Sequence, residues 1–265
     1  MALPEPVPSS TCLITGASSG IGADIARELA ARGHAVTLVA RREDRLKKLA
    51  NELSVAHGVH AEVAACDVSD PRARERLVAG IEERNVDVEV LVNNAGFGTA
   101  GHFVDLDRDR ELEMVRTNVE AVVDLCSTYV PQMVQRGRGA VLNVASVAAF
   151  QPLPRQATYA ASKAFVLSFS EALHQELGDS AVSVTALCPG PVPTEFTEVA
   201  GIEAEIPPIL ATTAEENARA AVKAMEKGRR GVIPGPVNMV SAMSARVTPH
   251  SVLLPLLNRF YPVGK

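Results

Sequence analysis

A tyrosine and a lysine four residues apart, Tyr159 and Lys163, are the residues of this chain best suited to acid–base chemistry. In a helix, residues at this spacing lie on one face, about one turn apart. An isolated tyrosine has a pKa of about 10, and a neighbouring cation favours the phenolate. Lys163 should therefore lower the pKa of Tyr159 until it can act as a general acid or base. Taken alone, the pair is also compatible with a solvated helix face.

A glycine-rich turn follows the first short apolar run, Cys12–Thr15, and precedes a helical pattern. Glycine permits a tight turn, and the helix N-terminus supplies amide donors and a partial positive charge for a pyrophosphate. Strand, glycine loop and helix in this order are the context of a dinucleotide site, although the spacing here is G-x-x-x-G-x-G and a plain turn is the alternative. The residues expected to bind the cofactor here are Gly16, Ser18, Ser19, Gly20, Ile21 and Gly22.

Two arginines, Arg41 and Arg42, follow the second apolar run, Ala35–Ala40. An NAD site usually carries Asp or Glu about 20 residues after the glycine fingerprint, where it binds the ribose 2′-hydroxyl. Arginine instead grips a phosphate with paired, charge-assisted hydrogen bonds. The pattern predicts NADP(H), with Arg41 as the main contact to the 2′-phosphate and Arg42 beside it. The alternative is that both arginines only begin a solvated helix.

Asp67 and Val68 follow the third apolar run and are expected to contact the adenine edge and ring. The alternative for Asp67 is to cap the helix that begins at Pro71, a position that Ser69 or Asp70 also suits.

Short apolar runs alternate with helical patterns along the chain. This alternation predicts an α/β fold, a doubly wound (Rossmann-type), mostly parallel seven-stranded sheet flanked by helices. We expect a flexible leader at 1–9, a single domain at 10–235 and a C-terminal helical extension of the same domain at 236–265. The expected strands are 12–15, 35–40, 59–66, 88–92, 140–145, 182–187 and 229–233, and the expected helices are 21–32, 43–57, 71–84, 110–136 and 157–177.

Composition limits the classes of function. The chain of 265 residues has 47% hydrophobic and 22% charged residues and a net charge of −5, which disfavours nucleic acid as a partner. The four cysteines lack metal-site spacing, so we expect buried, reduced thiols, no metal site and a cytoplasmic location. The N-terminal residues do not form a signal peptide, and no apolar run reaches the length of a membrane span.

Further motifs follow the remaining strands or, in the case of Asn118, lie within an expected helix. They are Asn93-Asn94-Ala95-Gly96, Asn118 between Thr117 and Val119, Ser146 placed 13 residues before Tyr159, and Pro189-Gly190. Together with the glycine loop and the Tyr159/Lys163 pair, these motifs resemble those of the short-chain dehydrogenase/reductase family over about residues 10–195. Because ligands bind beyond the carboxyl ends of strands in an open α/β sheet, these residues should gather on one edge.

The resemblance implies a role for each of these residues. Tyr159 would be the general acid, Lys163 would bind the nicotinamide ribose and lower the tyrosine pKa, and Ser146 would orient the substrate oxygen. Asn118 would hold a water that links Lys163 to solvent, although it could also satisfy a helix bulge, and Ser146 could merely cap a turn. The other residues expected at the cofactor are Asn94, Ala95, Gly96, Pro189, Gly190, Val192 and Thr194.

The function that follows is an NADPH-dependent oxidoreductase that reduces a hydrophobic ketone, aldehyde or 3-oxoacyl group to an alcohol. The alternatives are an NADP-linked alcohol or sterol dehydrogenase working oxidatively, and a non-catalytic dinucleotide-sensing protein. The segment 195–208 has the Gly, Pro and charge content of a mobile lid. The pocket is expected to be lined by Phe97, Val147, Phe150, Leu153 and residues 191–210.

The C-terminal residues 237–261 are apolar and helical in tendency. They could pack on their own domain or on a second subunit, or form a wall of the substrate site or a peripheral membrane contact. The family resemblance also implies a homodimer or homotetramer that uses the helices at 110–136 and 157–177.

Overall fold

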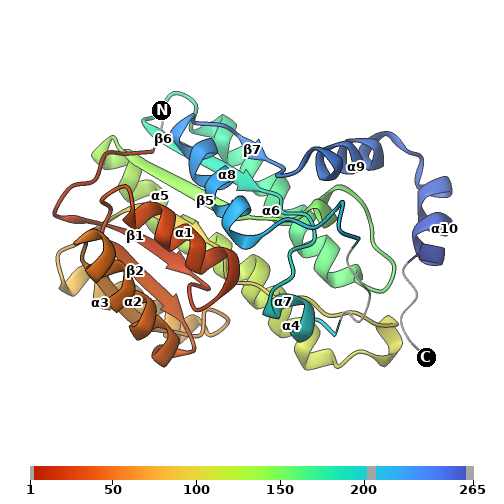
Figure 1. The fold of residues 1–265 in the computed structure, drawn as a ribbon, viewed down its shortest axis with the longest axis horizontal. Helices are drawn as coiled ribbons and strands as arrows, with labels where there is room; N and C mark the ends of the chain where they lie inside the picture. The colour runs from red at the N-terminus through yellow and green to blue at the C-terminus, as the bar shows by residue number, and fades with distance from the viewer. Residues whose placement is uncertain (1–2, 202–206, 261–265) are drawn as a thin grey trace.

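A seven-stranded parallel sheet forms the centre of the computed structural model, which describes residues 3–201 and 207–260 (Figure 1). The strand order is β3-β2-β1-β4-β5-β6-β7, and each neighbouring pair is parallel. The expected fold class is therefore confirmed. The chain reverses its direction of winding between β1 and β4, which is where open α/β sheets bind ligands. The strands are β1 (Ser10–Thr15), β2 (Val36–Ala40), β3 (Ala61–Ala65), β4 (Asp87–Asn93), β5 (Gly139–Val144), β6 (Val182–Leu187) and β7 (Gly231–Val232).

Helices connect the strands and cover both faces of the sheet. They are α1 (Gly20–Ala30), α2 (Glu43–His57), α3 (Pro71–Glu83), α4 (Arg108–Val115), α5 (Ala121–Arg136), α6 (Ala157–Glu176), α7 (Glu195–Val199), α8 (Ala214–Glu226), α9 (Pro236–Val247) and α10 (His250–Phe260). Shorter helical turns are η1 (Phe103–Asp105), η2 (Arg116–Glu120) and η3 (Val147–Phe150).

Two apolar layers hold the helices to the sheet. Ile14 of β1 packs in a cluster with side chains of α1, α2 and α8, whereas its neighbour Leu13 packs with α3, α5 and α6. Leu38 and Val39 of β2 divide between the same two clusters. This alternation follows from the period of two in a strand, so apolar runs buried on both faces are what a covered parallel sheet requires.

The edges of the sheet differ from the expectation. Strand β3 is shorter than the expected 59–66, and most of its residues are only half-buried because it pairs on one side alone, with β2. Helix α8 was not expected, although its N-terminus carries a capping box in which Thr213 and Glu216 bond to each other's backbone N–H.

The four cysteines are free and buried, as expected.

The expected helix at 110–136 is three segments. Helix α4 and helix α5 are joined by η2, a π-helical turn that contains Asn118. A π turn inserts one extra residue into a helix and often lies at a functional site. Periodicity in the sequence does not reveal such an insertion, because the residues on both sides are still helical.

The N-terminal segment from Leu3 onward lies against the domain. The backbone N–H of Leu3 donates to the Met225 carbonyl at 3.1 Å, and Arg138 donates to the Glu5 carbonyl at 2.8 Å. The C-terminal extension is two helices, α9 and α10, at the end of the molecule opposite α2 and α3 (Figure 1). Within residues 3–201 and 207–260, none of the helices has the length and hydropathy needed to cross a membrane. Parts of the expected leader (1–2), lid (202–206) and extension (261–265) lie outside the described residues.

Candidate active site

Tyr159 and Lys163 lie on one face of α6, as the four-residue spacing predicts. Both side chains are buried. The Lys163 Nζ lies 5.9 Å from the centroid of the Tyr159 ring and donates a hydrogen bond of 2.9 Å to the carbonyl of Val144, the last residue of β5. A backbone carbonyl at the carboxyl end of the sheet therefore holds the ammonium group beside the phenol.

Ser146 lies two residues beyond β5 and is the N-cap of η3, where its Oγ accepts a hydrogen bond of 3.1 Å from the Ala148 N–H. A hydrogen bond between the Ser146 and Tyr159 side chains also acts on the phenol. The serine therefore caps a turn and at the same time lies at the tyrosine, so the two interpretations of this residue do not exclude each other.

Asn118 uses its whole amide group to join two elements. Its Nδ2 donates to the Phe97 carbonyl and to Ser162 Oγ of α6, each at 3.0 Å, and its Oδ1 accepts from the Phe97 N–H at 3.2 Å. A Cβ placed on Gly96 would lie 2.9 Å from Asn118 Oδ1 and 3.3 Å from Lys163 Nζ. The π turn thus brings Asn118 and Lys163 to the same short stretch of backbone after β4.

Burial dominates the protonation of this pair. It raises the pKa of Tyr159 to about 12, opposed by the hydrogen bond with Ser146, and it lowers the pKa of Lys163 to about 8. The expectation that Lys163 depresses the tyrosine pKa is therefore not met in this structure. The physical reason is that both groups lose hydration, and the lysine interacts with a neutral carbonyl rather than stabilising a phenolate.

We expect Lys163→Met to raise the free energy of unfolding of the cofactor-free protein at pH 7. Burial lowers the pKa of Lys163 from 10.5 to about 8. At pH values where the lysine is charged in both the folded and the unfolded chain, this shift destabilises the folded protein by about 3 kcal/mol. Loss of the bond to Val144 offsets about 1 kcal/mol of this gain.

The pH dependence of this contribution to the free energy of unfolding is opposite to that of a salt-bridged lysine. Between about pH 8 and 10.5 the unfolded chain holds the proton more tightly than the folded chain, so this group makes the wild type more stable as the pH rises. The advantage of Lys163→Met should therefore shrink between pH 7 and pH 10 in urea unfolding. An advantage that does not change with pH would contradict this account.

The glycine loop has the form that a phosphate requires. Gly16 has a φ of +66°, and a Cβ on Gly22 would lie 2.3 Å from Asn94 Nδ2, so the backbone here is packed too closely for any side chain. Asn94 Nδ2 donates to the carbonyls of Thr15 and Gly16 at 2.9 and 3.2 Å. Ser19, the N-cap of α1, makes no side-chain capping bond, so the first amide groups of α1 are available to an anion.

Residues next to the glycine loop hold it in place. Ile21 packs on the core cluster beneath α1, and the N–H groups of Asn94 and Ala95 both donate to Thr15 Oγ1 at 3.0 Å. The β1 and β4 strand ends are therefore joined at the switch point of the sheet.

Arg42, rather than Arg41, reaches the glycine loop. Its guanidinium donates to Ser18 Oγ at 2.9 and 3.2 Å and to Ser19 Oγ at 2.9 Å. Arg41 turns away, toward Glu113 at 3.5 Å and Asp67 at 3.8 Å. Both arginines follow β2 directly, and Arg42 is the N-cap of α2.

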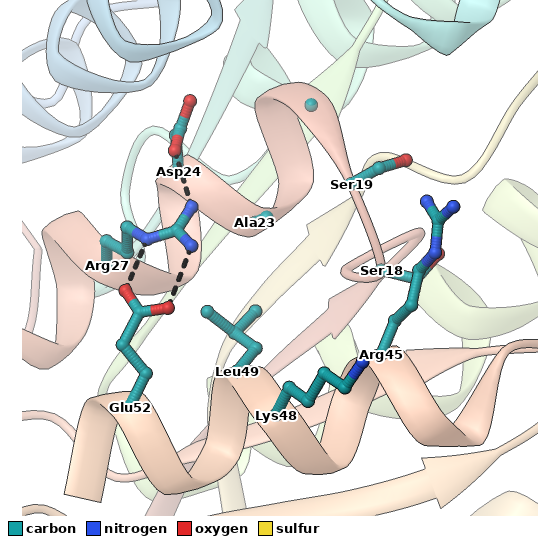
Figure 2. A pocket seen from close by; sticks show the side chains of 10 residues that line it. Ser18, Ser19, Ala23, Asp24, Arg27, Arg45, Lys48, Leu49 and Glu52 are labelled. Atoms are coloured by element: carbon teal, nitrogen blue, oxygen red, sulfur yellow. Dashed lines mark hydrogen bonds and ion pairs between the residues drawn. The ribbon is translucent and has the colours of Figure 1, made fainter. Parts of the chain in front are cut away.

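Two charged residues that the sequence did not single out join this cluster. Arg45 of α2 and Arg42 each pair with the carboxylate of Glu195, at 2.5 and 2.7 Å. Figure 2 shows Arg45 and Lys48 beside Ser18 and Ser19, in a cavity of about 400 Å³ between α1 and α2. Arg45 lies one helical turn after Arg42, which is the only sequence signal that could have suggested it.

Asp67 and Val68 follow β3. Asp67 accepts from the Ser69 N–H at 2.9 Å and from its Oγ at 2.7 Å. Asp70 caps α3 by accepting from the Arg72 N–H. Asp67 is thus not the helix cap, and Val68 is buried beside it, so a role for the pair at adenine stays a prediction.

The segment after β6 runs from the tyrosine to the glycine loop. The Pro189 carbonyl accepts from the Val147 N–H at 2.9 Å, and Gly190 packs directly on Asn238 of α9. Val192 lies in the following loop, and the methyl group of Thr194 lies 3.4 Å from where a Cβ on Gly20 would be. This segment therefore contacts η3 through Pro189, α9 through Gly190 and the glycine loop through Thr194.

An apolar cluster surrounds Tyr159. It contains Phe97, Met114, Ala148, Leu153 and Ala160, with Phe196 of α7 and Leu257 of α10 packed against it. The ring centroids of Phe196 and Tyr159 are 5.5 Å apart. Of the other residues expected at the pocket, Phe150 packs on the core beneath η3 and its ring contacts Arg246. The C-terminal extension thus contributes directly to the surroundings of the tyrosine.

Comparison with known proteins shows the family to which this chain belongs. A family model for short chain dehydrogenases matches residues 10–204. Sulfoacetaldehyde reductase 2 of Chromohalobacter salexigens is 39% identical over 193 residues, which cover 72% of this chain and 76% of that one. A Sphingobium yanoikuyae short-chain dehydrogenase in complex with NADPH superposes with a TM-score of 0.81 at 33% identity, covering 94% of this chain and 95% of the other.

A structure of a 7β-hydroxysteroid dehydrogenase superposes with a TM-score of 0.86 at 27% identity, covering 97% of this chain and all of the other. The chain belongs to the short-chain dehydrogenase family, a family of oxidoreductases. The matching segment spans 60% to 76% of the length of four curated relatives.

Proposed function

We propose that this protein reduces a hydrophobic carbonyl compound to an alcohol with NADPH. The observation that carries the proposal is the convergence of four side chains from three parts of the chain. Ser146, Asn118, Tyr159 and Lys163 gather around the backbone that follows β4, next to the glycine loop. A phenol, a hydroxyl and an ammonium group at the carboxyl edge of a dinucleotide-binding sheet are the groups that hydride exchange at a carbonyl requires.

Each side chain has a task in this proposal. NADPH, when bound, supplies the hydride. Tyr159, a neutral phenol at neutral pH whose pKa burial raises further, to about 12, donates its proton to the developing alkoxide. Ser146 hydrogen-bonds the substrate oxygen and orients it toward the phenol. Lys163, held by Val144, binds the nicotinamide ribose, and Asn118 fixes the loop after β4 against α6 and holds the water that links Lys163 to solvent.

The two directions of the reaction need opposite protonation states of the tyrosine. Alcohol oxidation needs a phenolate to accept the proton, whereas reduction needs a phenol to give one. Burial raises the pKa of Tyr159 and so disfavours the phenolate, which is the observation that favours the reductive direction here. The likeness to a hydroxysteroid dehydrogenase favours, as a second candidate, oxidation of a sterol alcohol with NADP⁺.

The proposed cofactor is NADP(H), on the strength of the basic cluster. Arg42 and Arg45 lie beside Ser18 and Ser19, and Arg41, not a carboxylate, follows β2. Guanidinium groups match a 2′-phosphate, whereas a 2′-hydroxyl calls for a carboxylate. Solved relatives described as NADPH complexes include an actinorhodin polyketide ketoreductase and an L-sorbose reductase.

A hydrophobic substrate is supported by the cluster around Tyr159. Phe97, Leu153, Phe196 and Leu257 bring apolar surface from four separate segments to the phenol. Relatives named for lipophilic substrates include a very-long-chain 3-oxoacyl-CoA reductase of Anas platyrhynchos and a bulky-bulky ketone specific alcohol dehydrogenase of Comamonas testosteroni. We therefore propose bulky ketones and 3-oxoacyl esters ahead of small polar carbonyls.

A substrate panel tests the proposal. Purified protein is mixed with NADPH and with ketones, aldehydes or 3-oxoacyl thioesters of increasing chain length, and the NADPH absorbance is followed. We expect kcat/KM to rise with the apolar size of the substrate. Turnover only of sterols with NADP⁺ would favour the second candidate, and NADPH binding without any turnover would support a dinucleotide sensor instead.

We also propose a cytoplasmic homodimer or homotetramer. Apolar side chains stay exposed on the helices expected at its interface, including Val134 of α5 and Phe165 of α6, whose ring stacks on Phe169 at 6.0 Å. Light scattering should give a mass of at least two chains, and Phe165→Glu should lower it. A monomer at all concentrations would remove this part of the proposal.

A further inference from the structure

A carboxylate of the chain itself lies among the arginines proposed to bind the 2′-phosphate. Glu195 is the first residue of α7, and its two oxygens take separate partners. Its Oε2 lies 2.7 Å from Arg42 Nη1, and its Oε1 lies 2.5 Å from Arg45 Nη1. The same Arg42 donates to Ser18 and Ser19 of the glycine loop. The Glu195 carboxylate therefore already forms ion pairs with both guanidinium groups.

This carboxylate is charged at neutral pH. Hydrogen bonds from Arg45 and then Arg42 lower the pKa of the Glu195 carboxyl to about 2. Both arginines and the glutamate are partly exposed, so solvent screens each pair and a competing anion can reach them. The Glu195 carboxylate thus stays ionised, but its ion pairs with Arg42 and Arg45 are weak enough for another anion to replace it.

The same short helix is tied to the catalytic residues. Thr194, just before Glu195, packs on Gly20 of the glycine loop. Phe196, just after it, packs on the ring of Tyr159 at 5.5 Å between centroids. Three consecutive residues therefore contact the glycine loop, the arginine cluster and the phenol ring.

We propose that Glu195 is a specificity-determining residue that competes with the 2′-phosphate of the cofactor for Arg42 and Arg45. The 2′-phosphate replaces the carboxylate on the two arginines and releases α7 from the phosphate cradle. NADH has no group that can replace it, and its 2′-hydroxyl instead meets a carboxylate that can accept a hydrogen bond. The residue thus sets how strongly the protein distinguishes the two cofactors. This inference rests on the proposed NADP(H) function.

The test compares cofactor affinities of wild type, Glu195→Gln and a matched control, Glu43→Gln. Glu43 lies next to Arg42 in sequence and is also exposed, but its carboxylate pairs with Lys47 at 2.6 Å. The control therefore removes the same charge close to the same site without touching the arginines. Dissociation constants of NADPH and NADH are measured by the fluorescence of the bound nicotinamide at fixed ionic strength.

We expect Glu195→Gln to bind NADPH about three- to tenfold more tightly than wild type, which is the range open to two exposed ion pairs. NADH affinity should stay equal or fall, and Glu43→Gln should change both by less than about twofold. In an Arg42→Ala/Arg45→Ala background, Glu195→Gln should have no effect on NADPH, because the groups for which it competes are gone.

The proposal is overturned if Glu195→Gln leaves NADPH affinity unchanged or weakens it. It is also overturned if NADH and NADPH tighten equally, because α7 would then act only as a physical cover. Wild type that binds no NADPH would remove the proposed function together with this inference. Wild type that binds NADPH and reduces carbonyls, with Glu195→Gln unchanged, would remove this inference alone.

Discussion

Tyr159→Phe should lower kcat/KM for carbonyl reduction by about 10²- to 10⁴-fold, the range typical of a lost general acid, and leave the NADPH dissociation constant within about threefold of wild type. Only the hydroxyl disappears. The ring keeps its contact with Phe196 and its place in the apolar cluster. Stopped-flow measurement of single-turnover NADPH oxidation separates the chemical step from binding and product release.

Another buried tyrosine provides the control. Tyr129 of α5 is equally buried, and its hydroxyl has no hydrogen-bond partner among the described residues. Tyr129→Phe should therefore keep wild-type kinetics, and its free energy of unfolding should be equal or higher. If Tyr159→Phe reduced the same carbonyl as fast as wild type, Tyr159 would not be the proton donor. Equal losses in both variants would point to a general packing defect.

Gly22→Ala should abolish most cofactor binding, with an NADPH dissociation constant raised by about 100-fold, equivalent to about 3 kcal/mol. The new Cβ would lie 2.3 Å from Asn94 Nδ2 and 2.5 Å from the Gly16 carbonyl oxygen. Neither atom can give way freely, because Asn94 bonds the end of β1 and Gly16 belongs to the loop itself. The free energy of unfolding should fall by about 1–3 kcal/mol, as for other overpacked sites.

Gly80→Ala is the matched control for this variant. Gly80 lies inside α3, and a Cβ there would meet no atom within 4 Å. It should raise the free energy of unfolding by about 0.5–1 kcal/mol through helix propensity and leave NADPH affinity unchanged. Isothermal titration and urea unfolding of both variants provide the comparison. Wild-type affinity in Gly22→Ala would mean that the cofactor phosphates do not approach this loop.

Local patterns in the sequence were sufficient for the architecture. Apolar runs with turn residues between them mark the strands of a covered sheet, and all seven expected strands match those of the sheet to within two residues at each end. The pairing of Tyr159 with Lys163 needed only the pitch of a helix. Helix α8 was missed although Thr213 and Glu216 signalled its start, so this omission was avoidable.

Sequence patterns alone therefore predicted the fold class, the glycine loop and the helix face that carries the phenol and the amine. These features depend on residues that are close together along the chain. Their spacing and their secondary-structure propensities can therefore be read from the sequence. The arrangement of distant segments was needed to show that Arg42 rather than Arg41 faces the loop, that Glu195 pairs with it across about 150 residues, and that burial raises the pKa of Tyr159. The physical reason is that ion pairing and desolvation depend on atoms brought together from distant segments, such as Phe196 and Leu257 around the phenol.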